Sequence, residues 1–124
     1  MNNVENRLGH AVEEYGSVYG LAKKNAKHAA TGEIEFPDGV DALRAVRDVL
    51  TEVGDILKED LEDRCYVAVV MAGTGNANPA LVVALIEKSK CSLGACAKEG
   101  LIKQSTAKKA LEKIKKAVLR YSEK

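Results

Sequence analysis

Five carboxylates in two short segments have the residue types and spacing of a divalent-cation site. Glu13 and Glu14 are adjacent, and Glu59, Asp60 and Asp63 follow one another closely further along the chain. In a helix, residues three and four positions apart share one face, so Glu59 and Asp60 could each project together with Asp63, while Glu13 and Glu14 lie beside the apolar stripe of the first predicted helix. Carboxylate oxygens are ligands that Mg²⁺ prefers. If the two segments are helices that pack antiparallel, the sequence predicts a magnesium site between them.

The same segments resemble the metal-binding motifs of the all-α NTP pyrophosphohydrolases, the MazG-like family. Residues 13–17 (EEYGS) resemble that family's Glu-Glu-x-x-Glu motif, with Ser17 in place of the third glutamate. Residues 59–63 (EDLED), followed by an apolar stretch and Asn78-Pro79, resemble its Glu-x-x-Asp motif, with Asp60 in place of the glutamate. The resemblance implies an all-α, Mg²⁺-dependent enzyme in which metal-bound water attacks a nucleotide phosphate and releases pyrophosphate.

The alternative is that these carboxylates lie on a solvent-exposed helix face. Lys58 and Arg64 flank residues 59–63 and could pair with them. Such exposed ion pairs contribute less than ~1 kcal/mol each. Because short acidic motifs arise easily in charged helices, we favour this alternative over the metal site.

A second candidate site is the basic C-terminal segment. Residues 98–124 contain nine lysines and arginines against three glutamates, whereas the preceding chain is net acidic. A predicted helix over residues 105–122 would carry the candidate nucleic-acid-binding side chains Lys108, Lys109, Lys113, Lys116 and Arg120. Phosphate binding needs only positive charge. The alternatives are a solvated helix face, which we favour, and pairing with the acidic region of a second copy.

Residues 66–86 (YVAVVMAGTGNANPALVVALI) form two apolar runs around a Gly/Asn/Pro turn. A strand, a glycine-rich turn and a helix start are typical of phosphate-binding loops, but the Gly-Lys-Ser/Thr ending is absent. A parallel sheet also needs several strands, and few candidates are visible. We therefore interpret the segment as a hairpin of two buried helices, with Asn78 as N-cap and Pro79 at the first helical position.

The cysteines and histidines indicate no metal or catalytic site. Cys65, Cys91 and Cys96 are odd in number and have no zinc-binding spacing, while His10 and His28 lie far from them. The first residues show no apolar signal region, and neither apolar run reaches the ~20 residues that span a bilayer. We expect a cytoplasmic protein with free thiols and no membrane association.

Helical periodicity dominates the rest of the chain. Apolar residues recur at helical spacing over residues 3–30, and residues 33–36 read as an extended linker. Residues 38–72 are predicted to form one helix or two, residues 78–90 another, residues 91–100 a short helix or loop, and residues 105–122 the last helix. The near absence of aromatic residues, with one Phe, four Tyr and no Trp, favours closely packed helices over a β-sandwich.

The sequence thus predicts one all-α domain over residues 1–124, a bundle of about four long helices and one short helix. The leading functional interpretation is a non-enzymatic binding or assembly module that forms a homo-oligomer or binds another protein. The alternative is the Mg²⁺-dependent pyrophosphohydrolase. The third interpretation is nucleic-acid binding through the C-terminal helix.

Overall fold

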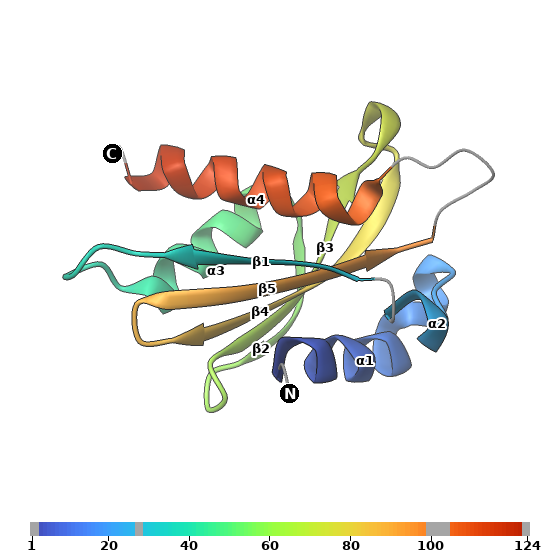
Figure 1. Cartoon of the computed structure of the whole chain (residues 1–124), viewed down its shortest axis with the longest axis horizontal. Helices are drawn as coiled ribbons and strands as arrows, with labels where there is room; N and C mark the ends of the chain where they lie inside the picture. The colour runs from blue at the N-terminus through green and yellow to red at the C-terminus, as the bar shows by residue number, and fades with distance from the viewer. Residues whose placement is uncertain (1–2, 27–28, 99–104, 123–124) are drawn as a thin grey trace.

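The computed structural model describes residues 3–26, 29–98 and 105–122, and it contains a five-stranded antiparallel sheet between helices (Figure 1). The predicted all-α bundle is therefore wrong. The five strands are β1 (Ala30–Glu35), β2 (Asp55–Asp60), β3 (Cys65–Ala72), β4 (Asn78–Glu87) and β5 (Lys90–Ala97). Strands β2 to β5 form a meander, and β1 pairs with β5, which gives the order β1-β5-β4-β3-β2. The two edges of the sheet are therefore β1 and β2.

The helices cover both faces of this sheet. They are α1 (Asn3–Tyr15), the 3₁₀ turn η1 (Gly16–Tyr19), α2 (Lys23–Ala26), α3 (Ala42–Val53), η2 (Thr74–Asn76) and α4 (Thr106–Ser122). Helix α1 packs on one face, and α3 and α4 pack together on the other. The predicted helix over residues 105–122 is confirmed as α4. The helix predicted over residues 3–30 ends at Tyr15, and Gly20 takes a left-handed conformation with φ 72°.

The two apolar runs of residues 66–86 are strands β3 and β4, not helices. Along both strands successive side chains point to opposite faces. Tyr66, Ala68, Val82 and other even-numbered residues pack under α3 and α4, while odd-numbered residues such as Val67 and Val83 pack under α1. Both faces are buried, so the alternation of apolar and polar residues that marks most antiparallel strands is absent.

The neighbouring segments change with this correction. Residues 73–77 do form a turn, but it joins β3 to β4, and Asn78-Pro79 begin a strand and not a helix. Residues 33–36, expected to be a linker, lie mostly in β1, and residues 91–97, expected to be a short helix or loop, form most of β5. Residues 38–72 contain one helix, α3, and two strands, β2 and β3. No helix in the described residues is long and apolar enough to cross a membrane.

The start and the end of helix α3 determine where the edge strand β2 begins. The side chain of Asp41 accepts a hydrogen bond from the Arg44 N–H at 3.2 Å and so caps the start of α3. Gly54 ends the helix and lies against the Val69 carbonyl of β3, where a Cβ atom would clash. The absence of a side chain at Gly54 therefore lets the chain turn directly from α3 into β2.

Candidate functional site

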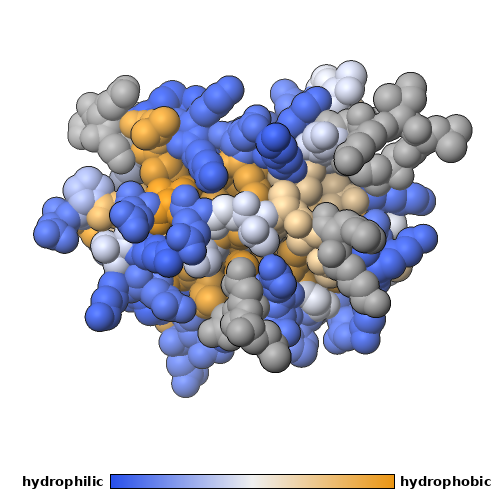
Figure 2. Space-filling model, in the orientation of Figure 1, coloured by the Kyte–Doolittle hydropathy of each residue, from blue (hydrophilic) through white to orange (hydrophobic). Residues whose placement is uncertain are grey.

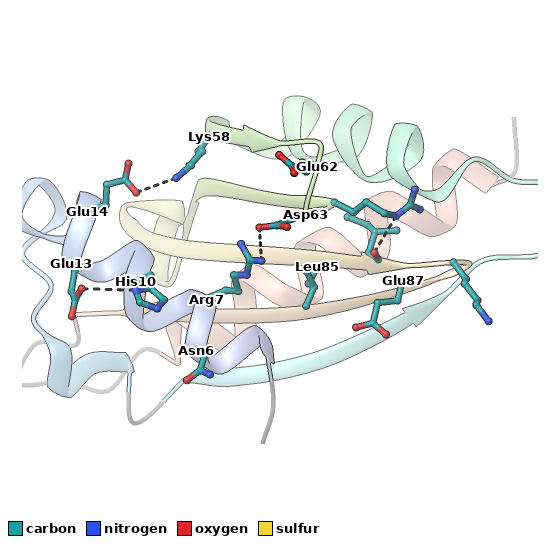
Figure 3. A pocket seen from close by; sticks show the side chains of 13 residues that line it. Asn6, Arg7, His10, Glu13, Glu14, Lys58, Glu62, Asp63, Leu85 and Glu87 are labelled. Atoms are coloured by element: carbon teal, nitrogen blue, oxygen red, sulfur yellow. Dashed lines mark hydrogen bonds and ion pairs between the residues drawn. The ribbon is translucent and has the colours of Figure 1, made fainter.

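Four of the five predicted metal-binding carboxylates lie in or beside a groove between α1 and the β2–β3 hairpin. This groove has a volume of about 1140 Å³, and its lining includes Glu13, Glu14 and Asp63 (Figure 3). Asp60 lies beside the same groove, because it shares the guanidinium of Arg7 with Asp63. Glu59 and Asp60 belong to strand β2, and Asp63 to the turn after it, so this group does not stand on a second helix.

Arg7 is the centre of this cluster. Its Nη2 donates to Asp63 Oδ2 at 2.8 Å, and its Nη1 lies 3.8 Å from Asp60 Oδ2. The hydrogen bond and the positive charge of Arg7 lower the pKa of Asp63. The backbone N–H of Asp63 also donates to Asp60 Oδ1 at 3.1 Å, which closes the turn locally. The arrangement holds the tip of the β2–β3 hairpin against α1.

The other three carboxylates also face cations. Glu14 pairs with Lys58 at 3.4 Å across the groove, and Glu13 pairs with Lys23 at 2.7 Å, a contact that lowers the pKa of Glu13. Glu59 points to the opposite face of the sheet, where it accepts from the Nε of Arg47 on α3 at 2.5 Å.

These carboxylates therefore act as ion-pair partners that tie elements together. The structure brings Glu13, Glu14, Asp60 and Asp63 to one groove, and it separates Glu59 from them. Among the described residues, no three His, Cys, Asp or Glu side chains group in a way that could hold a metal ion. The donors in the described part of the chain do not form a set that fits an Mg²⁺ site.

The predicted nucleic-acid-binding residues share α4. Lys108, Lys109 and Lys116 are exposed, while Lys113 Nζ donates to the Met71 carbonyl at 3.0 Å and Arg120 pairs with Glu52 at 3.4 Å. The apolar side of α4 is buried on the sheet, so the exposed side is predominantly basic. Hydrophilic side chains, interrupted by a hydrophobic patch, lie along the upper border of the molecule, where α4 runs (Figure 2).

The edge strand β2 forms a further candidate surface, which the sequence reasoning missed. A groove of about 360 Å³ runs between β2 and α3, lined by Arg47, Thr51 and residues 54–59. Ile56 and Leu57 in β2 are half-buried, and Leu61 at the hairpin tip is 61% exposed. The acidic composition of residues 55–63 gave no strand signal, and only the position of β2 at the edge of the sheet reveals the surface.

The three cysteines are buried thiols within the sheet. Burial raises the pKa of Cys91 to about 12 and that of Cys96 to about 11, and it also raises the pKa of Cys65. The thiolate is the reactive form of cysteine. At neutral pH these side chains are therefore protonated and serve as small apolar packing groups. His10 is an exposed residue on α1, 4.0 Å from Glu13, and His28 lies outside the described residues.

Comparisons of the chain with protein-family models, with curated proteins and with solved structures find no match.

Proposed function

We propose that this protein is a non-enzymatic assembly module that binds a second protein chain along strand β2, with another copy of itself as the primary partner. The single observation that carries the proposal is the combination, on one side of the molecule, of a sheet edge with exposed and half-buried apolar residues. An exposed edge presents a row of backbone N–H and C=O groups that can pair with an added strand. Addition of a strand to such an edge is a recurring mode of protein recognition.

The backbone of β2 supports this proposal. In the described residues β2 is the last strand of the sheet. One of its sides pairs with β3, and no strand pairs with its other side. The groove beside α3 runs along β2 and offers space for side chains of an added strand. Such a strand would continue the sheet and also contact α3.

Apolar residues on the same side supply a driving force. Leu61 is among the few large apolar side chains that the described structure exposes, and Ile56 and Leu57 are only partly covered. Ile56 packs toward the α3 face, and Leu57 packs toward the α1 face. Burying apolar surface contributes about 25 cal/mol per Å², so covering these residues favours association.

The charges and shape of β2 make the pairing selective. A bulge interrupts its register with β3 between Ile56 and Lys58, and Asp55, Lys58 and Glu59 are exposed. Bulges and charged residues on edge strands discourage indiscriminate pairing. An added strand must therefore match this irregular, charged edge, which favours one specific partner over general aggregation.

The test compares two leucines that are similarly exposed on different elements. Leu61 is 61% exposed at the tip of the β2–β3 hairpin, and Leu119 is 65% exposed on α4. Figure 1 shows α4 and the tip of the β2–β3 hairpin on opposite sides of the molecule. In sedimentation velocity over a wide concentration range, we expect the wild-type chain and Leu119→Lys to self-associate. Leu61→Lys should remain a monomer or associate at least tenfold more weakly, because it places a charge in the apolar contact.

Both leucines are exposed, so neither substitution should change the thermal stability of the monomer, and a melting curve checks this point. A wild-type chain that stays monomeric at every concentration would contradict self-association. Equal loss of association in Leu61→Lys and Leu119→Lys would contradict the assignment to β2.

The three buried free thiols suit a reducing compartment, and we assign the module to the cytoplasm on that basis.

A further inference from the structure

We propose that the outer face of α4 is a binding surface for the phosphate backbone of nucleic acids. The surface consists of Lys108, Lys109 and Lys116 on α4, continued at the start of the helix by Lys24 and Lys98. It is separate from the β2 edge, so it adds a second activity to the assembly module.

Among the described residues, positive charge is concentrated on this face. Helix α4 contains six lysines and arginines and a single glutamate, Glu112. The described residues outside α4 carry more carboxylates than basic side chains, since ten lysines and arginines stand against fifteen aspartates and glutamates. Among the described residues, α4 therefore attracts an anionic polymer, and the net negative charge of the other elements repels it.

The lysines of this face are available to a ligand. Lys108, Lys109 and Lys116 are exposed, and their side-chain amines make no ion pair or hydrogen bond with any other described residue. This distinguishes them from Arg120, which pairs with Glu52, and from Lys113, which donates to the Met71 carbonyl. No partner within the described residues has to be displaced before these three amines contact a phosphate.

The spacing of the lysines fits a phosphate backbone. Lys109 and Lys116 are two helical turns apart and lie on one stripe of α4, and Lys108 lies next to that stripe. With a rise of 1.5 Å per residue, residues 108–116 span about 12 Å. Phosphates of one strand advance about 3.4 Å per nucleotide along a duplex axis, so this stripe covers about four of them. Lys24 and Lys98 surround the same recess as Lys108 and extend the surface beyond the helix.

The surface is better suited to nucleic acid than to a membrane. An interfacial helix inserts an apolar face into the lipid. The apolar face of α4 is instead buried against the sheet through Leu111, Ile114 and Val118, and Leu119 is the only large apolar residue exposed on the described part of the helix. The face therefore offers charge alone, which is what sequence-independent phosphate binding uses.

The experiment measures binding of the full chain to a short DNA duplex and to the matching single strand by fluorescence anisotropy. We expect binding at about 50 mM salt that weakens steeply toward about 200 mM. The triple variant Lys108→Gln, Lys109→Gln, Lys116→Gln should bind at least tenfold more weakly. Its slope of log affinity against log salt should fall by about 3 for the duplex, at ~0.9 per lost phosphate contact.

Two control variants make the result specific. Glu112→Gln removes the single carboxylate from the lysine stripe and should strengthen binding several-fold. The triple variant Arg44→Gln, Lys88→Gln, Lys90→Gln changes the net charge by the same amount on other surfaces and should bind as the wild type does. Circular dichroism melts check that each variant folds, and the wild-type and Glu112→Gln results stand even if a triple variant does not.

Several outcomes would overturn the proposal. One is no binding of the wild-type chain at about 50 mM salt, where non-specific contacts are strongest. Another is an equal loss of affinity in the two triple variants, which would reflect net charge and not the α4 face. Equal or tighter binding to polyglutamate, or to vesicles containing phosphatidylserine, would assign the face to an acidic protein or to a membrane surface.

Discussion

At the scale of single residues, the β4–β5 hairpin contains an unusual backbone conformation. The two residues between these strands are Lys88 and Ser89, and Lys88 has a φ of 55°. Two-residue hairpin turns require positive φ at one or both positions, and glycine is favoured there because it has no Cβ. A lysine in this conformation carries a steric cost that glycine does not.

We therefore expect Lys88→Gly to stabilise the fold by about 0.5–1 kcal/mol, net of the greater flexibility of glycine in the unfolded chain. Urea unfolding monitored by circular dichroism measures the free energy of unfolding. The control is Lys88→Ala, which removes the long side chain but keeps the Cβ and should leave the stability nearly unchanged. If Lys88→Gly is no more stable than Lys88→Ala, strain at Lys88 does not lower the free energy of unfolding.

The candidate-site residues could be predicted from the sequence only in part. The interpretation of the carboxylates as ion-pair partners correctly included Lys58, but its partner is Glu14 on α1 and not a neighbour in the chain. Arg64 pairs with no carboxylate in the described residues and donates instead to the Ile86 carbonyl at 3.2 Å. No local spacing rule singles out Arg7, which binds Asp63. These pairs depend on how α1 crosses the sheet, which local spacing does not encode.

At the scale of elements, α4 was predictable because it buries one face only. Its apolar residues recur at helical spacing, and the exposed positions between them are charged. Strands β3 and β4 are buried on both sides, so their sequences are continuous apolar runs, which periodicity alone cannot distinguish from buried helices. Their high valine content was the available signal, because β-branched residues are enriched in strands.

The partner strands of β3 and β4 are β2 and β5, and their composition gives no clear strand signal. Strand β5 (KCSLGACA) contains small residues and no β-branched ones, because α1 and α4 approach it closely; Gly94, for example, lies under Val4 and Leu8 of α1. Strand β2 (DILKED) is charged because it is an edge. Without recognisable partner strands, two apolar runs and a turn predict a helical hairpin.

The connection between β4, β5 and α4 depends on one side chain. Asn78 Nδ2 donates to the Lys98 carbonyl at 2.9 Å and to Thr106 Oγ1 at 2.9 Å. Asn78 opens β4, Lys98 follows β5, and the fully buried Thr106 begins α4. The role of Asn78 is therefore to join two strands to the start of a helix, and not to cap a helix of its own.

We expect Asn78→Ala to lower the free energy of unfolding by about 1–2 kcal/mol, because hydrogen bonds of this kind contribute about 1 kcal/mol each. Chemical denaturation of Asn78→Ala, Thr106→Ala and the double variant measures how strongly the two side chains are coupled. The loss in the double variant should be smaller than the sum of the single losses, since both remove the same bond. Fully additive losses would mean that the amide and the hydroxyl act independently.

At the scale of the whole molecule, the two proposed surfaces belong to different elements. The assembly surface lies at β2 and α3, and the basic surface lies on the outer side of α4 (Figure 1). Pairing of two copies through β2 would leave both α4 helices exposed. A dimer would then present two basic faces, which increases the avidity for an anionic polymer if both faces can contact it at once.

The most direct test of assembly through β2 is amide hydrogen exchange, followed by mass spectrometry at low and high protein concentration. Exchange slows where backbone amides become hydrogen-bonded or buried. We predict that raising the concentration slows exchange in peptides from β2 (Asp55–Asp60), while peptides from the other edge strand, β1 (Ala30–Glu35), exchange at the same rate at both concentrations. Exchange in β2 that does not change with concentration, or a change confined to β1, would contradict the account.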